Sequence, residues 1–375
     1  GGGSARNLPG KRLLTQNEPS GNVRLLKRKG EFYDMAEKKK IAILTSGGDA
    51  PGMNAAIRAV VRSALYFDMD VYGVQDGYFG LLNDDMRLLS AGDVGDIIHR
   101  GGTMLGTARL PEFATDPAVR QQCYDNLNKR GIEGLVVCGG DGSYRGARLI
   151  QNESNINVIG LPGTIDNDLA YTDYTIGFDT AVNTCVDSIN KLRDTMASHG
   201  RVSVVDVMGR GCGDIAVHSG IAAGAEAILI PEIKKSDNQW LDYIVQKLRT
   251  SFARGKKYGI IVMAEGVYHA PKMHHFTADY IASWLNANAE TVGHRVDARG
   301  CVIGHVQRGG SPTASDRILS ARMGEEAVSL LRDGKGDLCV GIVKNRIVTV
   351  EIEKALSMKR RVDKHLIELA DSLAR

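Results

Sequence analysis

Short apolar runs that lead into glycine-rich turns recur along this chain of 375 residues. They cover residues 40–45, 134–138, 157–161, 201–208, 258–264 and 300–310. Between them, apolar residues return at helical spacing, as over residues 57–65 and 180–196. Strands that alternate with helices form mainly parallel sheets in α/β layers. Because 375 residues with 43% hydrophobic content exceed the usual size of one core, the sequence predicts two such domains.

Composition narrows the class of protein. The first 34 residues hold seven Lys and Arg against three Asp and Glu, so they supply +4 of the net charge of +3 and leave the remainder at −1. That balance argues against a nucleic-acid partner. No apolar run approaches the ~20 residues that span a bilayer, which argues against a membrane protein. The cysteines form no C-x-x-C pair, and we expect them to be reduced in a cytoplasmic protein. They are Cys123, Cys138, Cys185, Cys212, Cys301 and Cys339.

Residues 1–34 begin with a linker-like Gly-Gly-Gly-Ser and lack helical or strand periodicity. We interpret them as a leader or disordered arm and exclude them from the fold. A basic docking arm is the functional alternative.

A hydroxyl and two carboxylates follow the strand-like run at 157–161 within a few positions. Pro162 and Gly163 turn the chain there, so Thr164, Asp166 and Asp168 lie at the carboxyl edge of a strand, where open α/β sheets bind ligands. The extended period of two puts the three side chains on one face. Two carboxylates can share acid–base work, one as the proton acceptor. The alternative is an Asx-turn in an ordinary loop.

The run at 40–45 leads through glycines 47, 48 and 52 into a helical pattern. A glycine turn before a helix lets backbone N–H groups and the helix dipole face a phosphate. A P-loop is excluded because Met53 and Asn54 stand where Lys and Ser or Thr are needed. Asp68 and Asp70 lie where a ribose-binding acid would stand, so a dehydrogenase remains a rival hypothesis.

Two further glycine-rich segments carry charged groups. The first, residues 101–109, ends in Arg109, which is either a surface residue or a clamp for a transferring phosphoryl group. The second, residues 139–146, contains Asp141, a candidate Mg²⁺ ligand at the end of a strand. Its Gly-Gly-Asp-Gly sequence also marks kinases that act on NAD or lipids.

Residues 266–298 show no clear pattern, and we expect a surface elaboration. The four histidines of this region fit no helical metal pair. They are His269, His274, His275 and His294.

Together these motifs, in this order and spacing, resemble the ATP-dependent 6-phosphofructokinases of bacterial type over residues 37–375. The resemblance rests on residues 45–54, 139–143, 162–168, 208–210 and 304–310. It implies an α/β fold of two Rossmann-like layered domains with the active site in the cleft between them. The expected ATP-binding domain comprises residues 35–177 and 306–358, and the expected fructose 6-phosphate-binding domain comprises residues 178–305 and 359–375.

The resemblance also implies site residues. ATP would lie on Gly48, Tyr78, Arg109, Leu110, Gly142, Ser143 and Gly146, with Mg²⁺ near Asp141. Fructose 6-phosphate would contact Thr164, Asp166, Asp168, Met208, Gly209, Arg210, Glu265, His305 and Arg308. Arg201 and Arg299 would reach in from a neighbouring subunit of a homotetramer. The residues implied in catalysis are Asp166 as base, Arg109 and Gly48 as transition-state stabilisers, and Thr164, Asp168 and Arg210.

Two glycines favour ATP as the donor. In pyrophosphate-using relatives an Asp fills the position of Gly142 and a Lys that of Gly163, which blocks the nucleotide. A pyrophosphate-dependent enzyme is the alternative, and a non-catalytic nucleotide-binding subunit is a more remote one; the latter would require Asp166 or Arg109 to be replaced.

The resemblance extends in part to the effector site of the family. Matching residues are Arg58, Arg62, Arg193, Glu226, Lys256 and Lys257, with Arg254 in place of a lysine. Ala91 and Gly92 replace an arginine and an aromatic residue, and Ala114 replaces a basic residue near the nucleotide. We therefore expect only weak activation by ADP. For Arg58 and Arg62 the alternative is the solvated face of a helix.

Overall fold

The computed structural model describes residues 27–28, 31–32, 38–293 and 295–374. In the N-terminal segment, β1 (Lys27–Arg28) pairs antiparallel with β2 (Glu31–Phe32). The rest of the predicted leader, residues 1–34, lies outside the described residues. Residues 39–375 form a separate compact unit, which contains two sheets.

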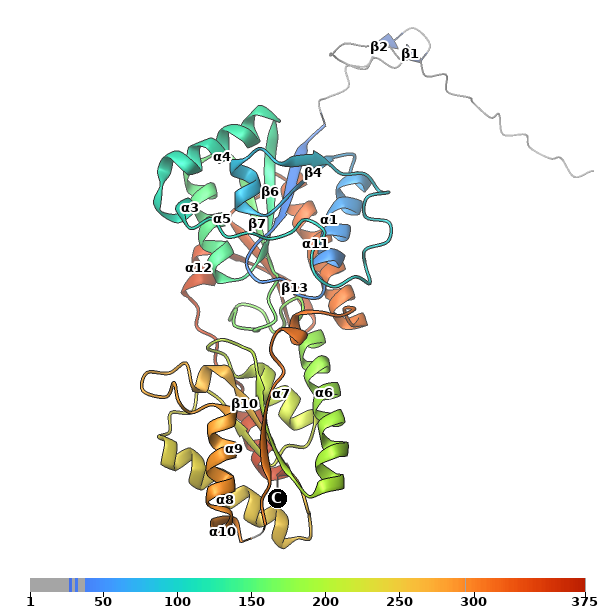
Figure 1. Ribbon diagram of the computed structural model, residues 1–375. Helices are drawn as coiled ribbons and strands as arrows, with labels where there is room; N and C mark the ends of the chain where they lie inside the picture. Colours follow the sequence, from blue (N-terminus) through green and yellow to red (C-terminus); the bar gives the residue numbers. More distant parts are fainter. Residues whose placement is uncertain (1–26, 29–30, 33–37, 294, 375) are drawn as a thin grey trace, which may run out of the picture. The chain divides into compact units, whose positions relative to one another are not determined.

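The larger sheet has seven strands in the order β13-β12-β7-β6-β3-β4-β5. Figure 1 labels β4, β6, β7 and β13 of this sheet. They are β3 (Lys40–Thr45), β4 (Asp70–Val74), β5 (Met86–Leu88), β6 (Ile132–Gly139), β7 (Asn157–Pro162), β12 (Leu338–Val343) and β13 (Arg346–Glu351). The five inner strands are parallel to one another, and the edge strands β5 and β13 are antiparallel to their neighbours. The predicted, mainly parallel α/β sheet is confirmed.

Helices cover both faces of this sheet. They are α1 (Met53–Tyr66), α2 (Tyr78–Leu82), α3 (Glu112–Thr115), α4 (Pro117–Lys129), α5 (Asp141–Glu153), α11 (Ala314–Arg332) and α12 (Ile352–Ser357). Successive side chains of a strand point to opposite faces. Accordingly, Ile41 and Ile43 join the apolar cluster of α1 and α11, whereas Ala42 and Leu44 join the cluster of α4, α5 and α12.

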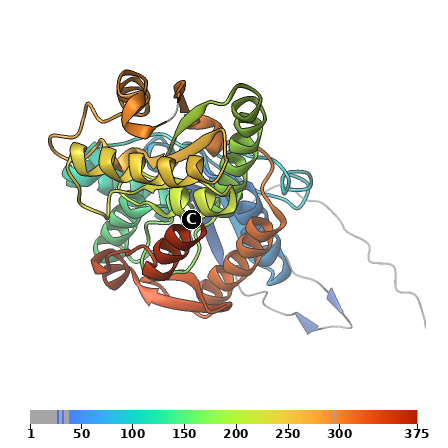
Figure 2. The same cartoon turned by 90° about the horizontal axis from the view of Figure 1, so that it is seen from below.

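The smaller sheet has four parallel strands in the order β11-β8-β10-β9. They are β8 (Val202–Val207), β9 (Ala227–Leu229), β10 (Gly259–Ala264) and β11 (Ala298–Val302). The helical segments of this part are α6 (Phe178–His199), α7 (Asp214–Ala222), α8 (Asp237–Ala253), η1 (Glu265–Val267), α9 (Ala278–Ala287), α10 (Ala289–Val292), η2 (Gly304–Arg308) and α13 (Lys364–Leu373). Helix α13, dark red in Figure 2, packs beside α7. Both sheets thus have the layered arrangement that the sequence predicts.

The structure corrects the interpretation of residues 266–298 as a surface elaboration. Phe276, Ile281 and Leu285 are fully buried in the apolar cluster beneath the smaller sheet, and α9 packs on β8 and β11. His269, His274 and His275 are exposed, and no group that could hold a metal occurs among the described residues. His294 lies outside the described residues.

The six cysteines are all free, and all but Cys301 are buried. Within the described parts of the chain, no helix is long and apolar enough to cross a bilayer.

Candidate active site

Two carboxyl groups at the end of β7 lack a partner for a buried oxygen. Asp166 is buried and Asp168 is half-buried, and the Oδ1 atom of each accepts no hydrogen bond from the described residues. Buried polar atoms are almost always hydrogen-bonded, so each such exception needs an explanation. A substrate hydroxyl or another ligand group would supply the missing partner.

The environment of Asp166 favours proton transfer near neutral pH. Burial, followed by the charge of Asp168, raises the pKa of Asp166 to about 6, although Arg308 and Arg210 oppose that shift. Burial also raises the pKa of Asp168. A base with its pKa close to the working pH combines the ionised state with a useful proton affinity.

Asn167 fixes the backbone between the two carboxyl groups. Its φ of 52° lies in the left-handed region, which Asn tolerates better than most residues. Its Oδ1 accepts from the Thr175 N–H at 3.0 Å, and its Nδ2 donates to Asp214 Oδ2 at 2.8 Å. The hydroxyl of Thr164 accepts the N–H of Asp166 at 3.2 Å. The turn is therefore held by Thr164 and Asn167, which leaves Asp166 Oδ1 free and disfavours the Asx-turn interpretation for that residue.

The glycine turn between β3 and α1 lies against Arg308. A Cβ at Gly48 would stand 2.5 Å from Arg308 Nη1, and the same Nη1 donates to the Asp49 carbonyl at 3.0 Å. Gly52, with φ of 117°, precedes the first residue of α1. Arg308 is the last residue of η2, which follows β11, so this contact brings its guanidinium next to Gly48 although the two lie far apart in the sequence.

The start of α5 contains the predicted nucleotide residues of the β6 turn. Asp141 begins the helix and pairs with Arg145 Nε at 2.9 Å. A Cβ at Gly142 would have no atom within 4 Å, so this position is open. The Tyr78 hydroxyl donates to the Ser143 carbonyl at 2.6 Å. Tyr78 is buried, and a Cβ at Gly146 would lie 2.7 Å from its ring, so the ring of Tyr78 packs directly against α5. Leu110 packs against the apolar cluster that contains Tyr78.

Gly163 has a packing reason of its own. A Cβ there would lie 2.7 Å from Cys138 Sγ and 3.1 Å from Met53 Cε. A side chain at position 163 would therefore disturb the core of this protein whatever the donor, and the donor argument depends chiefly on the open position at Gly142.

The loop that carries Arg109 is anchored at several points. Asn54 Nδ2 donates to the Gly101 carbonyl at 3.1 Å, and Asn54 Oδ1 accepts the Met104 N–H at 2.7 Å. The hydroxyl of Thr107 donates to the Gly47 carbonyl at 2.7 Å, which ties the loop to the β3 turn. Arg109 itself is exposed and makes no hydrogen bond or ion pair with the described residues. Its guanidinium is free to meet an anion.

The predicted sugar-site residues of the smaller sheet follow β8, β10 and β11. Glu265 Oε1 accepts the N–H groups of Gly209 at 3.1 Å and Arg210 at 2.7 Å. The N–H of Met208 donates to Gln307 Oε1 at 2.9 Å. These bonds fix the turn after β8. His305 is exposed on η2.

Arg201 and Arg299 lie at the other end of the sheet. Arg201 precedes β8, and Arg299 pairs in register with Ser203 near the start of that strand. Asp297 binds both guanidinium groups, Arg201 Nε at 2.6 Å and Arg299 Nη2 at 3.0 Å. One chain therefore does not bring them to the turn that follows β8.

The residues predicted for an effector form two groups. Arg58 and Arg62 lie on α1, whereas Arg193 lies on α6, and no hydrogen bond or ion pair among the described residues joins the groups. Glu226 is buried, pairs with Lys256 and accepts the N–H of Ile260, which is a structural role. Arg254 and Lys257 are exposed, as are Ala91 and Gly92. The effector site stays a prediction.

No separate role is predicted from the sequence for five residues that hold these turns, namely Asn54, Asn167, Asp214, Gln307 and Arg360. Asn54 and Gln307 are noted there only inside longer motifs, Asn54 also as a mismatch to a P-loop. Asp214 and Arg360 are joined by an ion pair of 2.8 Å beside the turn that carries Asp166 and Asp168, although 146 positions separate them. The sequence carries no local signal for that pair, whereas the tolerance of Asn for a left-handed backbone could have drawn attention to Asn167.

Comparison with known proteins finds relatives over most of the chain. Residues 40–331 match the family model described as phosphofructokinase. The ATP-dependent 6-phosphofructokinase of Staphylococcus carnosus is 52% identical over 338 residues, which cover 90% of this chain and 99% of that protein. The enzyme of the same description from Paenibacillus macquariensis is 50% identical over 336 residues, with coverage of 90% and 99%.

Solved structures share the fold. Phosphofructokinase from Saccharomyces cerevisiae superposes with a TM-score of 0.78 and 35% identity over 90% of this chain, which spans about half (48%) of the yeast chain. A pyrophosphate-dependent phosphofructokinase from Marinobacter aquaeolei has a TM-score of 0.72 at 23% identity, with 87% of this chain and 86% of that chain covered, and it supports the fold alone. The extent of the family match and the identity to the bacterial relatives show that this chain belongs to the phosphofructokinase family.

Proposed function

We propose that this protein is an ATP-dependent 6-phosphofructokinase. It transfers the γ-phosphoryl group of ATP to the 1-hydroxyl of fructose 6-phosphate and gives fructose 1,6-bisphosphate and ADP. The observation that carries the proposal is the buried Asp166 carboxyl group, with an unpartnered Oδ1 and a pKa near 6, close enough to Arg308 and Arg210 to feel their charges. Relatives of about half identity that are named for this activity support it.

Asp166 accepts the proton of the fructose 6-phosphate 1-hydroxyl. The oxygen of that hydroxyl bonds to the γ-phosphorus of ATP, and the bond between this phosphorus and the bridging oxygen breaks, so ADP leaves. The unpaired guanidinium of Arg109 and the N–H of Gly48 stabilise the charge on the transferring phosphoryl group. Thr164, Asp168 and Arg210 orient the acceptor. Phosphoryl transfer depends on alignment and charge stabilisation more than on covalent chemistry by the protein, and these residues supply both.

Asp141 would hold Mg²⁺ that arrives with the nucleotide. Proteins usually bind Mg²⁺ through one or two carboxylates together with substrate phosphates. The residues fit that pattern, because Asp141 is partly exposed at the start of α5 and its charge raises the pKa of the nearby Asp168. When bound, the ion neutralises negative charge on the nucleotide oxygens.

We further propose which parts of the chain bind each substrate and how the subunits assemble. Residues 35–177 and 306–358 bind ATP, and residues 178–305 and 359–375 bind fructose 6-phosphate in the cleft between them. His305 and Arg308 hold the 6-phosphate with Arg201 and Arg299 of a neighbouring subunit in a cytoplasmic homotetramer. Support comes from the position of Arg201 and Arg299, which one chain does not bring to the turn after β8.

An assay of fructose 1,6-bisphosphate formation with ATP or pyrophosphate as donor tests the proposal. We expect turnover with ATP and none above background with pyrophosphate. Turnover with pyrophosphate alone would favour the alternative enzyme, and no turnover with either would favour the non-catalytic subunit.

The Gly142→Asp variant tests the choice of donor at one residue. The open position accepts the side chain without a clash, so the variant should fold and place a carboxylate beside the nucleotide phosphates. We expect a rise in KM for ATP of about tenfold or more, by steric hindrance and like charge. The exposed Gly211, where a Cβ would also meet no atom, provides the control variant Gly211→Asp for the added charge. Unaltered ATP kinetics in Gly142→Asp would show that position 142 does not line the donor site.

A further inference from the structure

A chain of hydrogen bonds leads from residues 164–168, the catalytic loop of the proposed function, to the C-terminal part of the protein. Asn167 Nδ2 donates to Asp214 Oδ2 at 2.8 Å. The same oxygen accepts from Arg360 Nη2 at 2.8 Å and from Arg360 Nε at 3.2 Å. Asp214 is the first residue of α7, and Arg360 lies between α12 and α13. One carboxylate oxygen therefore connects the loop, the smaller sheet's helix α7 and the C-terminal segment.

The Arg360 guanidinium is fixed from a second side. Its Nη1 donates to the Thr172 carbonyl at 2.9 Å, and its Nη2 also donates to the Asp173 carbonyl at 3.3 Å. Asn167 Nδ2 donates to that same Asp173 carbonyl at 3.2 Å. Hydrogen bonds with a charged donor or acceptor are stronger than those between neutral groups, and the planar guanidinium directs its N–H groups in a fixed geometry. The network is also shielded, because only 3% of the Asp214 side chain and 22% of the Arg360 side chain are exposed.

We propose that Asp214 and Arg360 are positioning residues for the catalytic loop and act through Asn167. A non-glycine residue in the left-handed region persists only where its surroundings fix it. At Asn167 these surroundings are the contacts to Thr175, Asp173 and Asp214. Asn167 stands between Asp166 and Asp168, so a rotation of its backbone would move both carboxyl groups. The inference rests on the proposed function, because it assigns a support to the Asp166 base.

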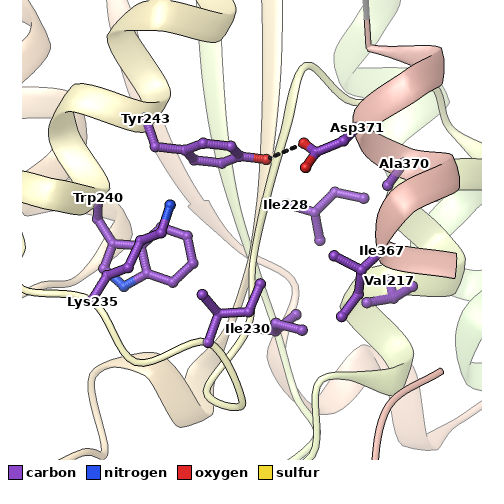
Figure 3. A pocket seen from close by; sticks show the side chains of 10 residues that line it. Val217, Ile228, Ile230, Lys235, Trp240, Tyr243, Ile367, Ala370 and Asp371 are labelled. Atoms are coloured by element: carbon purple, nitrogen blue, oxygen red, sulfur yellow. Dashed lines mark hydrogen bonds between the residues drawn. The ribbon is translucent and has the colours of Figure 1, made fainter. Parts of the chain in front are cut away.

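A second anchor of the C-terminal segment supplies a matched control. Asp371 Oδ1 on α13 accepts from the Tyr243 hydroxyl at 3.1 Å (Figure 3). The same oxygen pairs with Lys247 at 2.7 Å. Ile367 of α13 and Val217 of α7 line the same pocket, on the side away from Trp240. Asp371 thus holds the same segment to α8, but no bond connects Asp371 to Asn167 among the described residues.

The experiment compares Arg360→Gln, Asn167→Gly and Asp371→Asn in the full chain. Arg360→Gln removes the charge and the fork, and Asn167→Gly removes the donors to Asp214 without adding a charge beside Asp166, in a residue type that adopts the left-handed backbone freely. We expect both to lower kcat by about 10–100-fold, since a displacement of about 1 Å in a catalytic group costs on that order. The KM for ATP should change by less than about threefold, because donor binding is not affected. Arg360→Lys should recover part of kcat, whereas Asp371→Asn should leave kcat within about twofold of the wild type.

Thermal unfolding of each variant separates positioning from mere stability. If Arg360→Gln and Asp371→Asn lose similar stability while Arg360→Gln keeps the wild-type kcat, the inference is overturned. Should Arg360→Gln fail to fold, Asn167→Gly, which leaves the charges of Asp214 and Arg360 unchanged, decides by the same criterion. Asp166→Ser in the same series keeps the two claims apart. A nearly active Asp166→Ser variant would refute the base itself, whereas an inactive one beside a fully active Arg360→Gln variant would refute only the positioning network.

Discussion

At the scale of single residues, the charge neighbours of Asp166 determine its chemistry. Burial and the charges of Asp168 and Glu265 raise the pKa of its carboxyl group, while Arg308 and Arg210 lower it. The result, about 6 against an ordinary 3.8, leaves the group mostly ionised at neutral pH but with a much higher proton affinity than an exposed aspartate. The sequence placed Asp166 at a strand end, but burial and the approach of Arg308 come from distant parts of the chain and could not be derived from it.

The raised pKa of Asp166 predicts an acid limb in the pH profile. Only the ionised carboxylate accepts a proton, so kcat/KM for fructose 6-phosphate should fall as the pH drops through about 6. In Asp168→Asn the neighbouring negative charge is lost, so the limb of the residual activity should move to lower pH. A limb near the ordinary pKa of 3.8, or an upward shift in Asp168→Asn, would contradict this account.

At the scale of elements, local patterns predicted the strands well but not every helix. The expected strand at residues 40–45 is β3 without change, and the run at 157–161 is β7 with one added residue. The glycine turns that end them are local signals. The burial of α9 instead depends on contacts with β8 and β11. In the sequence, the histidines and polar residues that flank α9 make its apolar face hard to recognise. A segment of that kind is recognised only once its partner strands are known.

The corrected role of residues 266–298 predicts a large effect on stability. Phe276 is fully buried, so Phe276→Ala should lower the free energy of unfolding by about 3–5 kcal/mol through lost burial and a new cavity. Exposed His274 in the same segment is the control, and His274→Ala should change that free energy by less than about 0.5 kcal/mol. Denaturant titration followed by circular dichroism measures both. Equal, small effects would restore the interpretation of a surface elaboration.

At the scale of the whole molecule, Arg201 and Arg299, which pair with Asp297, lie far from the candidate active site of their own chain. Strand β8 has six residues, which at about 3.3 Å each separate Arg201 from the turn at Met208 by roughly 20 Å. A single chain therefore presents Arg201 away from its own Asp166. The family resemblance supplied the idea of a shared site, and this separation gives it a physical basis.

A shared site predicts complementation between two defective variants. Arg201→Ser and Asp166→Ser subunits are mixed in equal amounts and reassembled. At low fructose 6-phosphate the mixture should regain about a quarter of the wild-type activity, because about a quarter of the sites then combine an intact Asp166 with an intact Arg201 from the neighbouring subunit. Each variant reassembled alone serves as the control. Native mass spectrometry that detects hybrids without any regained activity would show that Arg201 does not serve a neighbour's site.

Asp166 is the proposed base of the phosphoryl transfer, and the steady-state kinetics of Asp166→Ser test this role. The serine keeps a small polar side chain but cannot take the proton, so kcat should fall by about 10²–10⁴-fold, while the KM values for ATP and fructose 6-phosphate change far less. An Asp166→Ser enzyme that retains about a tenth or more of the wild-type kcat would contradict the claim.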